Sequence, residues 1–187
     1  MKIKLLIFCA ITLCLPSCNN NRHHRNENRN RETTTDFYIS EKPISAFQIK
    51  KGVECPVRVV GITDGDTFKG LTSDNQQIKC RIYGIDAPEK KQAFGQKSKQ
   101  YLSDLIFGKT VTIKVQGKSF DRVVVWCYFD DGKDISAEMI KAGMAWHFKK
   151  YSNDDEYAQL ENKSRQMKIG LWSDKTPIAP WEWRKKK

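Results

Sequence analysis

Two short acidic motifs, I-T-D-G-D-T-F at Ile62–Phe68 and R-I-Y-G-I-D-A-P-E at Arg81–Glu89, decide the fold expected for this chain. Strand-forming residues flank both motifs, so the acidic side chains of Asp64, Asp66 and Asp86 lie where strands meet turns. Oxygen ligands that converge from two chain segments suit a hard cation such as Ca²⁺ or Mg²⁺. Asp-Gly-Asp turns also occur as ordinary hairpin tips, so the inference depends on the two motifs together.

The chain around the motifs has the pattern of a β-barrel. The first three expected strands form a curled meander, which brings Asp66 and Asp86 close together. The segment 117–121 reads as a loop between the last two strands. β-branched and alternating residues predict five strands: Val57–Ile62, Thr67–Leu71, Gln77–Ile85, Thr110–Val115 and Val123–Phe129.

Three segments have helical periodicity. Ser136 and Asn153 are the expected N-caps of the second and third helix. The helices are expected at Ala93–Phe107, Ser136–Ala142 and Asn153–Lys168. One helix follows the third strand and two follow the last strand. The sequence therefore predicts an α+β fold, a five-stranded OB-fold β-barrel with three outer α-helices, over residues 51–175.

The net charge of +11 is spread unevenly along the chain. Residues 51–175 hold 21 basic and 17 acidic side chains, so this domain carries only +4. The rest of the excess lies in residues 1–50 and in the tail at 176–187. The overall charge is therefore a weak indication of nucleic-acid binding by the domain itself.

The tail at 176–187 places Trp181 and Trp183 before a basic end. Aromatic side chains beside basic ones can stack on bases or lie at a membrane interface. We favour the alternative that the tryptophans fold back onto the barrel, because isolated tryptophans usually find apolar surface.

The N-terminal segment has the pattern of a secretion signal. Residues 1–17 combine two lysines with an apolar run that is too short to span a membrane as a stable helix. Leu15-Pro16-Ser17-Cys18 looks like a bacterial lipobox, in which Cys18 would be lipidated and become the mature N-terminus. Asn19–Asp36 has no apolar residue and predicts a disordered tether, so we assign residues 18–50 to the lipidated N-terminus and tether. We therefore expect a membrane-anchored lipoprotein of the cell envelope, periplasmic or surface-exposed; the alternative is an ordinary signal peptide with a chance cysteine.

Three cysteines, Cys55, Cys80 and Cys127, remain after the N-terminal segment. None has the C-x-x-C spacing of zinc or redox sites. Cys80 alternates with polar neighbours on its predicted strand and is expected to be a buried free thiol. The sequence alone does not decide whether Cys55 and Cys127 form a disulfide.

The two acidic motifs together resemble the signature of the staphylococcal-nuclease (thermonuclease) family, D-G-D-T followed by R-x-x-x-I/V-D-x-P-E. The resemblance extends over 54–172 and covers most of the mature chain. It implies a Ca²⁺ ion bound by the carboxylates of Asp66 and Asp86 and by the backbone carbonyl of Ala87. Asp64 more readily shapes the turn than binds the metal.

The resemblance also implies catalytic roles for Arg81, Glu89 and Arg122. Glu89 would activate or orient the attacking water, and the arginines would stabilise the charge that develops on the phosphate. Pairing of Arg122 with its neighbour Asp121 is the alternative for that arginine. Phe120 and Asp121 replace the tyrosine and glycine of the family pattern.

The expected substrate-binding residues are Phe120, Lys149 and Tyr151. Tyr151 matches a tyrosine that lines the nucleotide pocket in the family, whereas Lys149 stands where the family has a second tyrosine. His147, between two aromatic residues, is expected to be structural.

The resemblance implies a Ca²⁺-dependent endonuclease on DNA and RNA that breaks the 5′ P–O bond and leaves 3′-phosphate ends. We expect a monomer. A non-catalytic nucleic-acid-binding OB-fold module is the main alternative, and a structural lipoprotein that binds a protein partner is a weaker one. The combination of both carboxylates with Arg81, Glu89 and Arg122 favours the enzyme.

Overall fold

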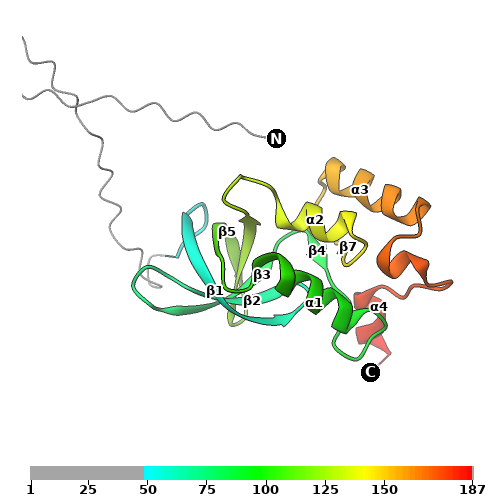
Figure 1. Ribbon diagram of the computed structural model, residues 1–187, viewed down its shortest axis with the longest axis horizontal. Helices are drawn as coiled ribbons and strands as arrows, with labels where there is room; N and C mark the ends of the chain where they lie inside the picture. Colours follow the sequence, from blue (N-terminus) through cyan, green and yellow to red (C-terminus); the bar gives the residue numbers. More distant parts are fainter. Residues whose placement is uncertain (1–48, 187) are drawn as a thin grey trace, which may run out of the picture. The chain divides into compact units, whose positions relative to one another are not determined.

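The computed structural model describes residues 49–186, which are built around a closed barrel of five strands (Figure 1). Neighbouring strands follow the order β1-β2-β3-β6-β5; β3 and β6 are parallel and the other pairs are antiparallel. The predicted five-stranded OB-fold barrel is confirmed. Its strands are β1 (Glu54–Asp64), β2 (Thr67–Leu71), β3 (Gln77–Ile82), β5 (Thr110–Ser119) and β6 (Arg122–Tyr128). The predictions for the N-terminal segment, Cys18 included, lie outside the described residues.

The barrel interior is filled by the apolar side chains that alternate along the strands. In β3, Ile78, Cys80 and Ile82 are buried, whereas Lys79 and Arg81 point to the outside of the barrel. The three cysteines of the described chain are buried free thiols, so the Cys55–Cys127 disulfide is not formed. Burial raises the pKa of Cys80, as expected for a thiol in an apolar core.

Four of the five strand ranges differ from the prediction, and the ends of β5 and β3 differ near the site. Only Phe120 and Asp121 of the expected loop 117–121 form a turn, because β5 passes through a bulge after Val115 and continues to Ser119. The predicted third strand ends early, at Ile82, where the chain turns at Gly84 with a φ of +77°. Outside the barrel, the next short strand, β4 (Ile85–Asp86), pairs with β7 (Trp146–His147), which comes after α2 in the chain.

Four helices accompany the barrel, not the predicted three. The additional helix α4 begins at a proline, which fits the first helical position, and lies in the expected tail. In Figure 1 the helices gather on one side of the barrel, and α3 packs on α2. They are α1 (Gly95–Ile106), α2 (Ile135–Lys141), α3 (Asp155–Gln166) and α4 (Pro180–Lys185), and a 3₁₀ turn spans Gly170–Ser173.

Both predicted N-caps are wrong by one or two positions. Asp134, not Ser136, caps α2 and accepts a hydrogen bond from the Ser136 backbone N–H at 2.7 Å. Asp154, not Asn153, caps α3 and accepts from the backbone N–H of Tyr157 at 3.1 Å. Several residues able to cap stand side by side at each helix start, so the sequence pattern does not distinguish them.

A second apolar cluster lies outside the barrel and seats the C-terminal helix. It contains Trp146, Leu171, Trp172 and Ala179, with Trp181 packed against it. Trp181 thus folds back onto the domain, but onto this cluster outside the barrel and not onto the barrel itself. Trp183 lines a small pocket of about 150 Å³ between α4 and the loop before α1.

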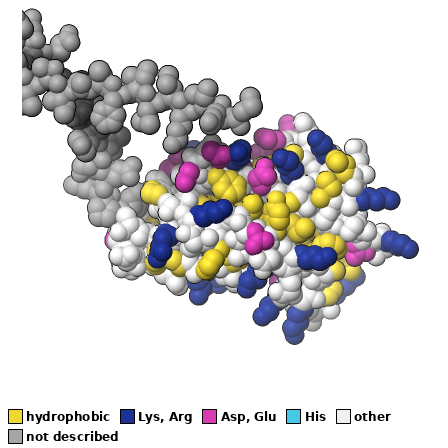
Figure 2. Space-filling model, in the orientation of Figure 1, with side chains coloured by type: hydrophobic (Ala, Val, Ile, Leu, Met, Phe, Trp, Pro, Cys, Tyr) yellow, Lys and Arg dark blue, Asp and Glu magenta, His cyan; other side chains and the backbone are white. Residues whose placement is uncertain are grey.

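Within residues 49–186, no helix combines the length and apolar character required to cross a membrane. On the face shown in Figure 2, lysine and arginine side chains stand apart, with acidic and hydrophobic side chains between them. The mixture of basic and acidic side chains on this face is consistent with the small net charge of the domain.

The glycine of the first motif is required by close packing. A Cβ atom on Gly65 would lie 2.8 Å from the Cβ atoms of Ala87 and Ser98. We expect Gly65→Ala to lower the free energy of unfolding by about 1–3 kcal/mol, because overpacking moves these neighbours. Gly117→Ala is the control, since its Cβ would meet no atom within 4 Å. Denaturant unfolding of both variants checks this, and equal stability of the two would contradict it.

Candidate active-site cleft

The turn between β1 and β2 places Asp66 at the edge of the barrel. The Asp64 side chain accepts a hydrogen bond from the Asp66 backbone N–H at 3.2 Å, so Asp64 shapes the turn, as expected. The Asp66 carbonyl accepts from the Ile82 backbone N–H at 2.8 Å. The turn is therefore fixed against the end of β3, beside Arg81.

Strand register brings Arg81 and Arg122 to one face of the sheet. Arg81 lies opposite Val124 in the parallel pair of β3 and β6, and Arg122 precedes Val124 by two residues. Residues two apart on a strand share a face, so both guanidinium groups project outside the barrel. Each raises the electrostatic potential at the other, and proximity to Arg122 is one of the influences that lower the pKa of Arg81.

The carboxylates of Asp66 and Asp86 are buried, with 3% and 1% of their surface exposed. Arg81 bridges them through an ion pair with Asp66 and a 2.9 Å contact with Asp86 Oδ1. Asp66 Oδ2 accepts from the Ala87 backbone N–H at 2.8 Å. Burial lowers the pKa of Arg81, and the neighbouring Asp86 opposes that shift. The arginine stays charged because guanidinium pKa values are far above neutrality.

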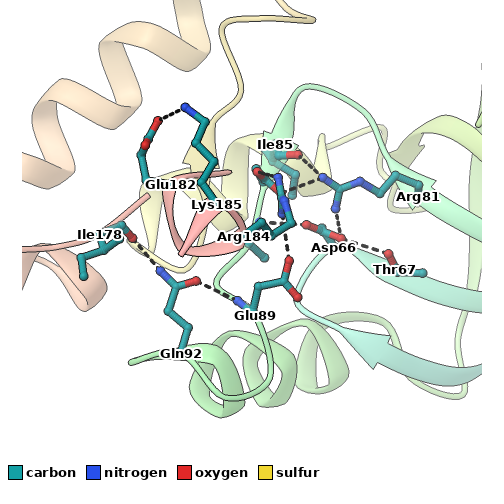
Figure 3. A network of polar contacts seen from close by, with 12 residues as sticks. Asp66, Thr67, Arg81, Ile85, Glu89, Gln92, Ile178, Glu182, Arg184 and Lys185 are labelled. Carbon is teal, nitrogen blue, oxygen red and sulfur yellow. Dashed lines mark hydrogen bonds and ion pairs between the residues drawn. The ribbon is translucent and has the colours of Figure 1, made fainter. Parts of the chain in front are cut away.

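Glu89 stands at the mouth of the cleft, in the loop that follows β4. Its backbone N–H donates to the Gln92 side chain at 3.0 Å, and the Gln92 amide donates to the Ile178 carbonyl at 2.6 Å. The Glu89 side chain is partly exposed and lies 2.9 Å from a guanidinium nitrogen of Arg184 (Figure 3). The loop is therefore connected to the segment before α4.

One cleft of about 1140 Å³ brings together the residues that the sequence assigns to metal binding, catalysis and substrate binding. They come from barrel strands and their turns, from β4 and the loop after it, and from the turn after β7, so the barrel and the segments outside it converge on the cleft together. The residues that line it include Asp66, Arg81, Asp86, Ala87, Glu89, Phe120, Arg122, Lys149 and Tyr151.

Arg122 makes no ion pair with the residues that the structure describes. Its neighbour Asp121 pairs instead with Lys79 at 3.0 Å, so the pairing considered for Arg122 is not formed. Phe120 occupies the hairpin turn beside it, with 98% of its surface exposed and a φ of +54°. A non-glycine residue at this φ is unusual, and here it presents an aromatic ring to the cleft and to solvent.

Lys149 has an acidic partner that the sequence did not indicate. Its ammonium nitrogen lies 3.2 Å from the carboxylate of Glu161, which is buried on α3 and also pairs with Arg165. A phosphate would therefore have to compete with Glu161 for this lysine. Tyr151, by contrast, is 60% exposed, although its ring contacts Phe148 edge-on at 4.9 Å and the Lys150 ammonium lies 5.5 Å from its centroid.

His147 is buried, with 2% of its surface exposed, and its ring lies edge-on to Tyr157. Burial lowers the pKa of His147, which favours the neutral imidazole. These observations agree with the structural role expected for it.

Sequence reasoning missed Arg184. Its guanidinium lies 2.7 Å from Asp86 Oδ2 and 2.9 Å from Glu89 Oε1, although both partners are more than ninety residues away in the sequence. The sequence feature that could have indicated Arg184 was the spacing in α4. Trp181 and Arg184 are three residues apart, so their side chains lie on the same face of the helix.

The residues of the cleft suit a hard cation in donor type. Among residues 49–186, no group of three or more His, Cys, Asp or Glu side chains is placed to hold a metal ion. The predicted Ca²⁺ site needs only Asp66 and Asp86 as side-chain ligands, with the Ala87 carbonyl and water. Carboxylate, carbonyl and water oxygens are the ligands that Ca²⁺ takes.

The structure is an OB-fold barrel with buried carboxylates and with arginines on its outer face. These features define a known class of protein. Residues 79–174 match the family described as staphylococcal nuclease homologues. The chain belongs to this family.

Similar proteins include an uncharacterized endonuclease of Haemophilus influenzae, 48% identical over 129 residues, with 68% of this chain and 72% of the relative covered. An uncharacterized endonuclease of Escherichia coli is 40% identical over 131 residues, with 70% and 85% covered. A micrococcal nuclease of Shigella flexneri is 36% identical over 138 residues, with 68% and 79% covered.

Arg81 differs from Arg122 in its contribution to stability. The role expected for both arginines requires access to a phosphate, but only 15% of the Arg81 side chain is exposed. Arg81→Ala would leave two buried carboxylates without their shared partner, and we expect a loss of about 3–5 kcal/mol in the free energy of unfolding. The free energy of unfolding of Arg122→Ala should lie within about 0.5 kcal/mol of that of the parent protein. Denaturant unfolding of both variants measures the difference, and equal losses would contradict the pairing.

Proposed function

We propose that this protein is a Ca²⁺-dependent endonuclease that hydrolyses phosphodiester bonds in DNA and RNA. The observation that carries the proposal is the convergence of two buried carboxylates, Glu89 and two arginines on one cleft. Nuclease relatives at 36–48% identity support it.

Each group has a role that fits its surroundings. Asp66 and Asp86 would hold Ca²⁺, which supplies positive charge beside the phosphate oxygens when it is bound. Glu89, on the exposed side of the cleft, would accept the proton of the attacking water. Water would attack phosphorus and the bond to the 5′ oxygen would break; the departing 5′ oxygen would take up a proton from solvent, leaving a 3′-phosphate and a 5′-hydroxyl group.

Arg122 is the arginine best placed to meet a phosphate oxygen directly. It makes no ion pair within the described chain and stands at the strand start, beside the exposed ring of Phe120. Its fork of N–H groups matches the charge that grows on two phosphate oxygens in the transition state. Phe120 and Tyr151 expose rings on which bases could stack.

The decisive test is cleavage of plasmid DNA and of RNA with Ca²⁺ and with excess chelator. We expect cleavage only with Ca²⁺, and a loss of at least about tenfold in Glu89→Gln, because loss of a general base costs about 10²–10⁴ in rate. Glu138→Gln, on α2 and paired with Lys141, is the matched control. Full activity in chelator would contradict the metal role. DNA binding without any cleavage would favour the non-catalytic binding module.

We also propose that Cys18 is lipidated and anchors the protein to a membrane of the cell envelope. The support is its position after the apolar run, in Leu15-Pro16-Ser17-Cys18. A long polar segment would then separate the anchor from the barrel.

Replacement of that cysteine tests the anchor. We expect Cys18→Ser to release the protein from the membrane fraction or to block its processing, because acyl chains provide the attachment. Cys55→Ser is the control, since this cysteine lies in the barrel. Fractionation and the mass of the mature N-terminus are the measurements. Continued membrane association of a fully processed Cys18→Ser protein would contradict the proposal.

A further inference from the structure

Arg184 connects the two acidic groups at the mouth of the cleft. Its Nη2 lies 2.7 Å from Asp86 Oδ2, and its Nη1 lies 2.9 Å from Glu89 Oε1 and 3.3 Å from Asp86 Oδ1 (Figure 3). One guanidinium therefore pairs at the same time with a proposed metal ligand and with the proposed general base.

The position of α4 does not depend on these ion pairs. The Trp181 ring stacks on Phe148 with centroids 5.3 Å apart and an interplanar angle of 6°, and it meets Trp146 edge-on at 5.5 Å. The residue before the helix, Ala179, is buried in the same cluster. Aromatic contacts of this size hold the helix beside the cleft whichever partner Arg184 has.

The Arg184 side chain is free to change partner. It is 43% exposed, compared with 15% for Arg81. A long side chain on a fixed helix has several staggered rotamers open to it, so a new partner for the guanidinium does not require movement of the helix. Of the two arginines bound to Asp86, only Arg184 can therefore leave without a rearrangement of the barrel wall.

Asp86 Oδ2 is the oxygen that such a movement would release. It accepts from Arg184, and no other hydrogen bond to it occurs among residues 49–186. The other three carboxylate oxygens of the pair also have partners, from Arg81 or from the Ala87 backbone N–H. A divalent cation that uses Oδ2 must displace Arg184 or share the oxygen with it.

We propose that Arg184 is a further substrate-binding residue of this cleft, paired with Asp86 and Glu89 until a divalent cation binds and then transferred to a phosphate oxygen of the nucleic acid. The proposal rests on the proposed function. A guanidinium pairs with phosphate in the same two-pronged geometry as with carboxylate, so it exchanges one partner for another of similar shape. The same movement frees Glu89 to act on water.

Two binding measurements test the proposal without using cleavage. The first is a calorimetric titration of the purified protein with Ca²⁺ alone. Arg184→Gln should bind Ca²⁺ about fivefold more tightly than the parent protein, because a competing cation is removed from Asp86. The matched control is Lys185→Gln, which removes the same charge from the next position of α4, where the lysine pairs with Glu182 at 2.9 Å.

The second measurement uses adenosine 3′,5′-bisphosphate in saturating Ca²⁺. This ligand carries a phosphate on each side of the sugar and has no diester bond to cut. Arg184→Gln should bind it about tenfold more weakly, because an arginine–phosphate contact is lost. Arg184→Lys should lie between the two, because it keeps the charge but loses the fork. A melting curve for each variant shows whether the fold is retained.

The opposite directions of the two effects identify the role. A residue that only supports the fold would weaken both ligands together. Arg184→Gln with the same Ca²⁺ and bisphosphate affinities as Lys185→Gln would overturn the proposal. If the parent protein fails to cut nucleic acid but both shifts appear, the enzymatic function is wrong and the role of Arg184 stands.

Discussion

Two buried carboxylates that share one arginine constrain the rest of the molecule. Isolated carboxylates at this depth would carry a large desolvation penalty, and Arg81 offsets part of it by bridging Asp66 and Asp86. The bridge requires that the first turn, the end of β3 and strand β4 meet at one point. A closed barrel with a short extra strand satisfies this requirement, so the architecture and the electrostatics of the cleft depend on each other.

The sequence predicted the barrel well because local patterns specify strands. Alternation along β3, with Ile78 and Cys80 inside and Arg81 outside, is visible without any structure, and it orients the arginine correctly. The acidic motifs were placed correctly for the same reason, since each ends a strand. Helix starts were less certain, because adjacent residues such as Asn153 and Asp154 have nearly equal capping ability.

Depth and long-range pairing were not visible in the sequence. Arg81 was expected to stabilise charge on a phosphate, yet β4 and the first turn enclose it on the outside of the barrel. Arg184 was read as part of a basic tail, because its carboxylate partners come from a loop far earlier in the chain. Lys149 was assigned to substrate without its buried partner Glu161, which is separated from it by a helix start. In each case the missing information was the three-dimensional neighbourhood.

The position of α4 in the sequence has a consequence for how the cleft is assembled. Barrel closure joins β1 to β5 and β3 to β6, so the pairings span long stretches of sequence, and folds of this kind form slowly. Helix α4 follows all of these strands in the chain and carries Arg184, which pairs with Asp86 and Glu89. A variant truncated before α4 would therefore keep all five barrel strands but leave Asp86 and Glu89 with one guanidinium fewer. The barrel and the charge balance of its cleft are thus specified by separate parts of the sequence.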